Sequence, residues 1–499
     1  MHEPRHMTPD EFKAAGYAMV DRIAAYWEAL QTRPSEMPIA ASVKPGETFA
    51  ALPAHPPEAG EAWAQIAADI DRVVMPGITH WQHPAFFGFF SSNISGPSVL
   101  AELLCAGLGV QGMLWATSPA ATEVEMRMMD WLGEAIGLPP SFLFGNSPFT
   151  SSGGGVIQGT ASEAALVAMV AARYRASKVA PRGPFVVYAS TQAHSSITKS
   201  AVVAGIARHM DDREHIRLIE VDDELAMRPE SLLREMKADL AAGRTPLLVV
   251  ATVGTTSTTA IDSIAGITSA IDALTSPVRP WLHVDAAHAG AALVCPEFRP
   301  LAAGVEHADS FCFNPHKWLL TNFDCDCFWT RDRAALVNAM SITPEYLRNA
   351  ASQSGEVIDY RDWQVPLGRR FRSLKLWFVL RHYGLEGLRA HIREHVKAAA
   401  TFEALVRTDA RFEVTSPRTM NLVCIALAPG PSETLETTNA RTKALHHTLN
   451  ASGTMLVTHT VLPNGRYVIR FAISGTFTRE EHARQAWADV MKMATHLGN

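Results

Sequence analysis

Cysteine and long apolar stretches are both scarce in this sequence of 499 residues. Its six cysteines include no Cys-X-X-Cys pair, so a disulfide scaffold is excluded and a reducing compartment is favoured. Apolar runs such as 247–253 fall far short of the roughly 20 residues that a membrane-spanning helix needs. The segment 1–12 has no apolar stretch after its basic residues, so no secretory signal is predicted. We expect a soluble, cytoplasmic protein.

An excess of positive charge is also missing. There are 44 Lys and Arg against 50 Asp and Glu, a formal net charge of −6. This balance gives no electrostatic reason to expect nucleic acid or an acidic membrane surface as a partner. With 47% hydrophobic and 19% charged residues, the composition is that of a globular chain. The length corresponds to about two to four domains.

The N-terminal region reads as a helical arm. The segment 8–11 (Thr-Pro-Asp-Glu) supplies an N-cap, a proline at the first helical position and a glutamate three residues after the cap. An apolar stripe continues to Leu30, which predicts a helix. The stretch 32–57 is rich in proline and small residues, and a second helix is expected over 62–74. Such an arm has little core of its own, so we expect it to pack on another domain or subunit.

From about residue 150 the pattern changes to helices alternating with short apolar runs. Helices are predicted over 160–177, 229–241 and 263–274, and strands over 184–190, 246–253, 281–285, 310–313 and 325–330. Continuous apolar strands between helices are typical of a mostly parallel sheet covered on both faces. A ligand site in such a sheet lies beyond the carboxyl ends of the strands. From about Ser373 the pattern favours a smaller α+β domain, with strand-like runs at 421–427 and 467–473.

The glycine-rich segment 153–163 (GGGVIQGTASE) is a candidate phosphate site. Glycines let a backbone approach a ligand closely, and the first N–H groups of the following helix attract anions. Thr160 and Glu163 have the spacing of a capping box. A capped helix after a flexible loop would explain the same residues, and a nucleotide P-loop is unsupported because no Gly-Lys-Ser/Thr follows.

Three further residues follow predicted strands and could carry chemistry. Lys317 lies between an apolar strand and the segment 318–320, where desolvation would lower its pKa and make it an imine-forming nucleophile. Asp285 ends a buried strand and His194 follows another. Taken singly, each has an ordinary structural explanation. Together, a phosphate cradle, a strand-end carboxylate, a histidine and such a lysine describe a pyridoxal phosphate site.

At the level of whole motifs, the chain resembles the group II pyridoxal-phosphate decarboxylases, most closely the aromatic-L-amino-acid decarboxylases. The motifs that carry the resemblance are HPAFF (83–87), SPA (118–120), MDWL (129–132), GGGVIQGTASE (153–163), AHSS (193–196), HVDAAHAG (283–290), ADSFCFNPHKWLL (308–320), NFDC (322–325) and PLGRRFR (366–372). The resemblance implies a fold-type I α/β enzyme with a mostly parallel seven-stranded central sheet. It also implies an N-terminal helical arm (1–95), a large cofactor-binding domain (96–374) and a small α+β domain (375–499). A homodimer is implied as well.

The resemblance assigns roles to individual residues. Lys317 would form the imine with pyridoxal 5′-phosphate, Asp285 would pair with the pyridinium nitrogen, and His194 would stack on the ring. The other implied cofactor contacts are Ala161, Ser162, Thr256, Asn314 and His316. Tyr346 matches a mobile-loop tyrosine that acts on the substrate after CO2 leaves.

The implied reaction is decarboxylation of an aromatic L-amino acid (tryptophan, 5-hydroxytryptophan, phenylalanine, tyrosine or dopa) to its amine. Candidate substrate contacts are His194, Ser92, Gly368 and the aromatic cluster of Trp81, Phe86, Phe87 and Phe89, since aromatic walls favour flat side chains and Gly368 leaves space. An aromatic aldehyde synthase, a histidine or glutamate decarboxylase and an aminotransferase remain alternatives. His194 and Tyr346 match the decarboxylase pattern, which argues against the aldehyde-forming variant.

Four short patterns are interpreted as decoys. The segment 107–112 matches GxGxxG but follows no convincing strand, so no nicotinamide site is predicted. The segment 391–395 matches HxxEH, yet two surface histidines on a solvated helix are a simpler explanation than zinc. Cys325 and Cys327 lack a second ligand pair and are predicted to be buried thiols, so no metal is expected. The basic run 369–372 is isolated, and the resemblance implies that it forms internal ion pairs rather than a nucleic-acid site.

Overall fold

The computed structural model describes residues 6–181, 183–341, 351–352 and 356–497, and its architecture rests on two sheets of different size. The larger sheet has seven strands in the order β1-β7-β6-β5-β4-β2-β3. Its strands are β1 (Gly154–Gln158), β2 (Phe185–Ser190), β3 (Ile216–Ile219), β4 (Thr245–Thr252), β5 (Trp281–Asp285), β6 (Ser310–Phe313) and β7 (Asp326–Thr330). Strand β7 pairs antiparallel with both β1 and β6, and the remaining pairs are parallel. The expected mostly parallel α/β sheet is therefore confirmed.

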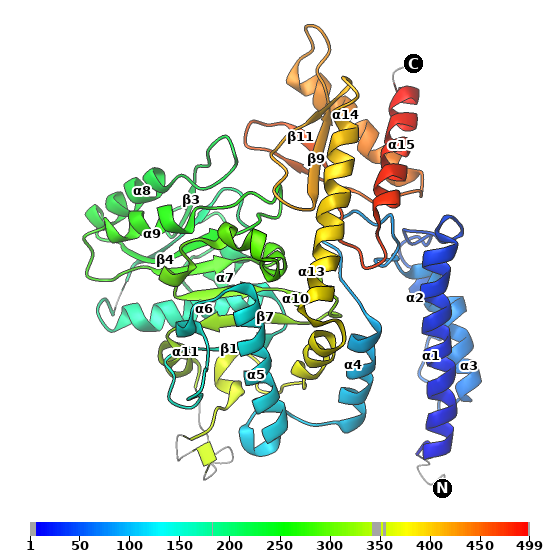
Figure 1. The fold of residues 1–499 in the computed structure, drawn as a ribbon, viewed down its shortest axis with the longest axis horizontal. Coiled ribbons are helices and arrows are strands. Elements are labelled where there is room, and N and C mark those ends of the chain that lie inside the picture. The colour runs from blue at the N-terminus through cyan, green and yellow to red at the C-terminus, as the bar shows by residue number, and fades with distance from the viewer. Residues whose placement is uncertain (1–5, 182, 342–350, 353–355, 498–499) are drawn as a thin grey trace.

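Helices cover this sheet and fix its ligand-binding edge (Figure 1). They are α5 (Pro119–Ile136), α6 (Ala161–Ser177), α7 (Ser196–Val203), α8 (Pro229–Ala241), α9 (Ile264–Asp272), α10 (Pro315–Trp318) and α11 (Arg333–Met340). Helix α4 (Gly96–Leu108) lies to one side of the sheet. Helix α6 contacts β1, β4, β5, β6 and β7, so its N-terminus is held at one edge of the sheet. Helices and loops cover the apolar strands, and the strand residues are therefore largely buried.

The glycine-rich segment 153–163 is divided between strand β1 and the first turn of α6, which begins at Ala161, and the predicted phosphate site at that helix start stays a prediction. Gly154 and Gly155 belong to β1, and side chains of the core fill the space where their Cβ atoms would lie. A Cβ on Gly155 would be 2.5 Å from the Met129 Cε, and one on Gly154 would be 2.4 Å from Phe144 Cε1. These glycines therefore serve close packing of the strand against large side chains.

The capping box predicted at the start of α6 is also absent. The Thr160 side chain forms no capping hydrogen bond, and the Glu163 carboxylate instead accepts from the Gly159 N–H at 3.1 Å. The N-terminal end of α6 is consequently left without a side-chain cap.

The C-terminal part forms the second sheet, in the antiparallel order β10-β11-β9-β8. Its elements are β8 (Phe412–Val414), β9 (Leu422–Leu427), α14 (Leu435–Ala451), β10 (Thr458–Val461), β11 (Tyr467–Ala472) and α15 (Glu480–Leu497). Helix α13 (Ser373–Val406), broken at Gly384, packs on α4 and α5 and also on α15 and β9. It thus spans both parts, and the domain boundary near residue 374 stays a prediction.

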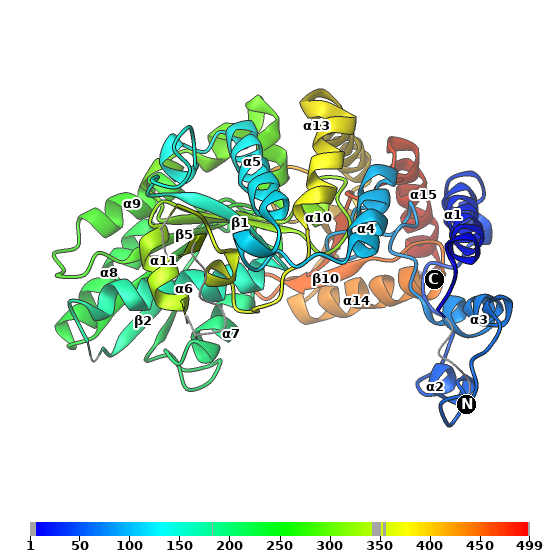
Figure 2. The same cartoon turned by 90° about the horizontal axis from the view of Figure 1, so that it is seen from below.

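The N-terminal arm stands at one end of the molecule (Figure 1, Figure 2). Helix α1 (Pro9–Thr32) begins with the predicted capping box of Thr8 and Glu11, and α2 (Glu47–Ala51), α3 (Trp63–Asp69) and a π-helical turn (Ile70–Val74) follow. Leu30 is the only residue of α1 that is buried. Among the described residues, no helix is both long and apolar enough to cross a membrane.

Two further sequence-based predictions concern buried groups and are confirmed. The basic run pairs internally, because Arg369, Arg370 and Arg372 bind Glu125, Glu102 and Asp324 respectively. All six cysteines are buried free thiols. They include Cys327 of β7 and Cys325, which directly precedes that strand.

The prediction that His391 and His395 face solvent is wrong. Both are buried, because α13 lies between neighbours on more than one side and has no single solvated face. The Trp318 Nε1–H donates to His395 Nδ1 at 2.9 Å, and His391 Nε2 lies 3.3 Å from Asn93 Oδ1. The two rings thus serve as hydrogen-bonding groups of the core.

Burial of neutral histidines makes stability depend on pH. Burial lowers the pKa of four histidines to about 4 or about 3, namely His283 and His395 (about 4) and His288 and His316 (about 3). In an unfolded chain a histidine titrates near pH 6.5. Between these pKa values the unfolded state binds protons on these histidines and the folded state does not. The free energy of unfolding is therefore largest above pH 6.5 and falls as the pH is lowered towards 4.

We predict that the free energy of unfolding falls between pH 6.5 and 4 by about 1.4 kcal/mol per pH unit for each such histidine. His395→Gln, which can accept and donate but does not titrate, should make this slope shallower by about one proton. Urea unfolding at a series of pH values measures it. His307→Gln, at a largely exposed position, is the control, and an unchanged slope in His395→Gln would contradict the prediction.

Candidate functional site

A cavity of about 260 Å³ opens at the carboxyl edge of the large sheet. It is lined by Phe90, Thr160, Ala161, Ser162, His194, Ser196, Thr252, Gly254, Thr256, Asp285, Ala287, His288, Asn314, His316, Lys317 and Phe323. Asp285 ends β5, Asn314 follows β6, and the loops after β2 and β4 bring His194 and Thr256. The parallel strands end at one edge, so residues distant in sequence meet there.

Lys317 extends into this cavity from the short helix α10. Burial lowers the pKa of its amine, and the nearby carboxylates of Asp285 and Asp326 oppose that shift. Its Nζ lies 5.7 Å from the centre of the Phe90 ring. An amine with lowered basicity is neutral more of the time, which is the form that attacks a carbonyl carbon.

Asp285 and His194 present their polar atoms to the same cavity. The Ala287 N–H donates to Asp285 Oδ1 at 3.0 Å, which fixes the carboxylate at the strand end. The Ser196 N–H donates to His194 Nδ1 at 3.1 Å, so the neutral ring carries its proton on Nε2. Burial lowers the pKa of His194 and favours this neutral form.

The N-terminus of α6 faces the cavity without a side-chain cap. Thr160 has extended backbone angles and no capping side chain, and Ala161 and Ser162 of the first turn line the cavity. The first N–H groups of a helix have no partner within the helix and carry partial positive charge. A phosphate group at this point would satisfy them.

Orphaned polar atoms indicate that the cavity is shaped for a ligand with hydrogen-bonding groups. Thr252 Oγ1 and Asn314 Oδ1 are buried at its lining and have no hydrogen-bond partner among the described residues. An amine of lowered basicity, a fixed carboxylate and an anion site in one cavity fit a phosphorylated pyridine aldehyde, pyridoxal phosphate. The fold and the site thus define an enzyme that works through this cofactor.

Comparison with known proteins agrees with the site. Residues 45–428 match the family described as the pyridoxal-dependent decarboxylase conserved domain. Phenylacetaldehyde synthase of Arabidopsis thaliana is 43% identical over 98% of this chain and 97% of that protein. Tyrosine decarboxylase 2 of Narcissus pseudonarcissus is 44% identical over 98% and 95%. The crystal structure of Oryza sativa TDC with PLP and tryptamine has a TM-score of 0.92, 40% identity and full coverage of both chains.

The chain belongs to the pyridoxal-dependent decarboxylase family. It has the α/β architecture of fold-type I, and its cofactor is pyridoxal 5′-phosphate. The resemblance drawn from the sequence motifs is confirmed.

The structure brings together the predicted cofactor residues, and of the predicted substrate residues only His194 joins them. Lys317, Asp285, His194, Ala161, Ser162, Thr256, Asn314 and His316 all line the cavity. Trp81, Phe89, Ser92 and Gly368 do not, and their roles stay predictions. Tyr346 lies outside the described residues.

The predicted aromatic cluster divides into an exposed and a buried part. Trp81 and Phe89 are exposed and stack with ring centres 5.4 Å apart. Phe86 is buried, and its ring centre lies 4.7 Å from that of Trp81. Phe87 instead packs on Phe471 in the core of the small sheet.

Sequence reasoning missed three rings of the lining, namely Phe90, His288 and Phe323. Phe90 stacks on His288 with ring centres 3.7 Å apart, and His288 stacks on Trp318 at 4.8 Å. Phe90 adjoins the aromatic residues that were proposed, but a positive φ of 53° at Phe89 turns the chain between them. No periodicity in the sequence signals such a turn at a non-glycine residue.

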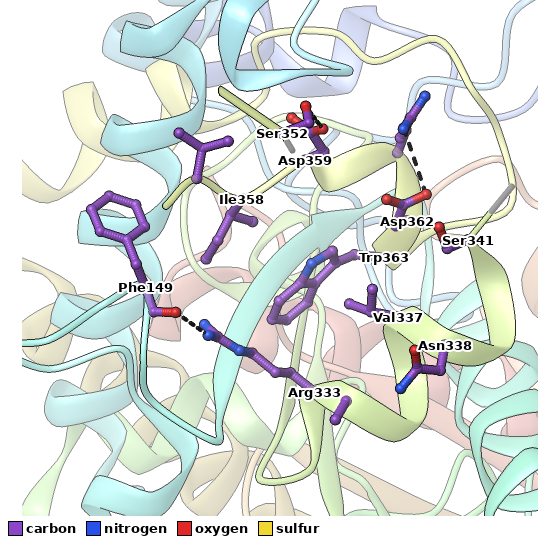
Figure 3. Close-up of a pocket in the computed structure, with 13 residues that line it drawn as sticks. Phe149, Arg333, Val337, Asn338, Ser341, Ser352, Ile358, Asp359, Asp362 and Trp363 are labelled. Atoms are coloured by element: carbon purple, nitrogen blue, oxygen red, sulfur yellow. Dashed lines mark hydrogen bonds and ion pairs between the residues drawn. The ribbon is translucent and has the colours of Figure 1, made fainter. Parts of the chain in front are cut away.

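A second cavity, of about 440 Å³, lies between α11 and the 3-10 helix Tyr360–Trp363 (Figure 3). Arg333 donates there to the carbonyl oxygens of Pro148 and Phe149, and Arg361 lies 3.6 Å from a carboxylate oxygen of Asp362. Arg361 Nε and Nη1 are buried without a hydrogen-bond partner among the described residues, and no lysine is among the described lining residues of this cavity. The cofactor chemistry belongs to the first cavity.

We predict that Ser162→Asp weakens pyridoxal phosphate binding by on the order of tenfold or more, because it places a carboxylate where the phosphate would lie. Ser162 is exposed, so the fold should tolerate the change. Absorbance titration of apoenzyme with the cofactor measures the effect. Ser177→Asp, at the other end of the same helix, should bind like the wild type, and equal affinity of the two variants would refute the assignment.

Proposed function

We propose that the protein decarboxylates an aromatic L-amino acid to its amine and CO2. The observation that carries the proposal is the cavity in which the Lys317 amine, the Asp285 carboxylate and the start of α6 converge. Relatives that match nearly the whole chain are named for tyrosine and phenylacetaldehyde chemistry, and both involve aromatic compounds. The buried free thiols support a reducing, cytoplasmic setting.

Each residue of the cavity has a part that follows from its chemistry. Lys317 would hold the cofactor aldehyde covalently, and Ala161 and Ser162 would bind its phosphate. When bound, pyridoxal phosphate supplies a conjugated ring that takes up the electron pair left at the α-carbon when CO2 departs. The Asp285 carboxylate would keep the ring nitrogen protonated through its opposite charge. The neutral His194 would lie against the ring and orient the substrate.

The lining favours a flat apolar substrate side chain. Phe90 and His288 form a stacked wall of rings, and burial lowers the pKa of His288 to about 3, so this wall is uncharged at neutral pH. A glutamate side chain would find no cationic partner in such a wall, whereas an aromatic ring would find area to stack on.

The tyrosine predicted to act late in the reaction is Tyr346. Its hydroxyl would return a proton to the α-carbon after CO2 leaves, as a positioned general acid. That step decides the product, because an unprotonated α-carbon is open to oxygen and yields aldehyde in place of amine.

The proposed function predicts amine and CO2 in equal amounts from at least one of tryptophan, 5-hydroxytryptophan, phenylalanine, tyrosine and dopa. A steady-state panel that also includes histidine and glutamate tests it. Lys317→Ala should abolish turnover and the label that borohydride fixes to the Lys317 peptide. A clear preference for glutamate or histidine, or label on another lysine, would overturn the assignment.

The same assay separates decarboxylase from aldehyde synthase, the alternative that the 43% identical phenylacetaldehyde synthase favours. Aldehyde, ammonia and hydrogen peroxide are measured beside amine, with and without oxygen. Amine should dominate in the wild type. Tyr346→Phe, which removes only the hydroxyl, should shift the product towards aldehyde, and unchanged amine formation would exclude the proton-donor role.

We further propose that the protein is a homodimer joined through α4 and the N-terminal arm. One face of α4 packs on α13 through Ala101 and Cys105. The opposite face carries a row of half-exposed leucines at helical spacing: Leu100, Leu103, Leu104 and Leu108. The arm adds Phe12, Tyr17 and Val20, which are also exposed. Exposed apolar side chains gathered on one helix face are typical of an interface.

Glutamates in place of Leu103 and Leu104 should convert the dimer to a monomer, because a self-complementary contact would bury four like charges. Sedimentation equilibrium at micromolar concentration measures the mass. Leu435→Glu, on an exposed position of α14, is the control and should remain dimeric. A wild-type protein that sediments as a monomer would refute the proposal.

A further inference from the structure

The loop 254–260 carries Thr256 to the cavity after strand β4. Within the loop, the N–H groups of Gly254 and Thr255 both donate to the Ala260 carbonyl at 3.0 Å, and the Ala260 N–H donates to Thr255 Oγ1 at 3.0 Å. These bonds tie the two ends of the loop together. They leave the carbonyls of its tip, at Thr256 and Ser257, to be held by something else.

The small sheet holds that tip. Arg470 of β11 donates from Nε to the Ser257 carbonyl at 2.9 Å and from Nη2 to the Thr256 carbonyl at 2.6 Å. The Thr460 hydroxyl of β10 lies 3.3 Å from Ser257 Oγ. A loop that lines the cavity of the large domain is therefore positioned from the second sheet.

Arg470 also lies against Phe90, a second residue that lines the cavity. Its guanidinium carbon lies 5.4 Å from the centre of the Phe90 ring. Its Nη1 donates to Thr458 Oγ1 at 2.8 Å, and the same hydroxyl oxygen accepts the Phe89 N–H at 3.2 Å. One side chain thus links the turn at Thr256 with the chain segment that presents Phe90.

The guanidinium of Arg470 is buried, with 4% of the residue exposed, and it forms no ion pair among the described residues. Arg369, which is equally buried, pairs with Glu125. Burying a cation without a counter-charge is costly, and here carbonyl dipoles and a ring face take the place of a carboxylate. The planar guanidinium of arginine can donate to two carbonyls at once from fixed positions, and the single ammonium of a lysine cannot reproduce this geometry.

We propose that Arg470 is a positioning residue for the reaction: it holds Thr256 and Phe90 in the places from which they contact cofactor and substrate. The proposal rests on the proposed function of the cavity. Arg470 itself does not line the cavity, so it acts through these two residues. Misplacing such groups by about 1 Å can lower turnover on the order of 100-fold without unfolding the protein.

The test compares Arg470→Met, Arg470→Lys and Thr458→Val in the full-length holoenzyme. Thr458→Val keeps the volume of the side chain but removes the acceptor of Nη1 and of the Phe89 N–H. The matched control is Arg466→Met, since Arg466 also donates to a carbonyl of the small sheet, that of Leu427 at 2.8 Å, but does not touch the loop. The measurements are the cofactor dissociation constant, circular dichroism in the absorption band of the bound cofactor, kcat and KM.

We expect both Arg470 variants to lower kcat on the order of 10- to 100-fold and to change the circular dichroism of the bound cofactor. Thr458→Val should change both in the same direction by less, and Arg466→Met should match the wild type. Because lysine retains the charge but not the fork, failure of Arg470→Lys to restore kcat supports positioning. If Arg470→Met does not fold, the kcat and circular dichroism of Arg470→Lys and Thr458→Val test the proposal instead.

Wild-type circular dichroism and kcat in Arg470→Lys would overturn the proposal, because the charge alone would then suffice. So would equal losses in Arg470→Met and Arg466→Met. If the wild-type enzyme forms no amine from any aromatic amino acid, the proposed function fails instead. Cofactor affinity and circular dichroism would still report whether Arg470 positions the loop.

Discussion

The burial of one lysine amine beside one carboxylate is the constraint on which the rest of the site depends. Lys317 has a lowered pKa because it is buried, and it can be buried because Asp285 lies near enough to offset part of the cost. Both residues stand at the carboxyl ends of neighbouring strands, so the parallel order of β5 and β6 is what brings them together. A sheet with another strand order would separate them.

The packing of the sheet serves the same edge. Glycines in β1 admit the side chains of Phe144, Met129 and Trp329, which lets the strand lie close against α5 and β7. Helix α6 leaves β1 after a short turn, and its uncapped N-terminus therefore points at the cavity. The glycines of β1 therefore affect the cavity through the helix that they position.

The two sheets share the support of the cavity. His288 Nε2 lies 2.9 Å from Oδ1 of Asn421, which directly precedes β9. Arg470 of β11 donates a hydrogen bond to the Thr256 carbonyl in the loop after β4. Trp318, next to the lysine, donates to His395 of α13. Polar contacts that cross between the parts are buried, so each needs its partner in place. The small sheet accordingly supports the cavity from outside its lining.

The sequence by itself determined the alternation of strands and helices, the capped start of α1 and the strand-end residues Asp285 and His194, and its resemblance to a known family pointed to the other predicted residues that line the cavity. Those features depend on local periodicity, on capping chemistry and on strand ends that a parallel sheet must bring to one edge. It could not show that Gly154 and Gly155 lie in a strand, that Phe90 and not Phe89 faces the cavity, or that His391 and His395 are buried. Nor could it show that Arg470 reaches the loop at Thr256. These outcomes depend on which distant segments pack together, and only the tertiary structure decides that, because a contact between β11 and the loop after β4 leaves no trace in the local order of either segment.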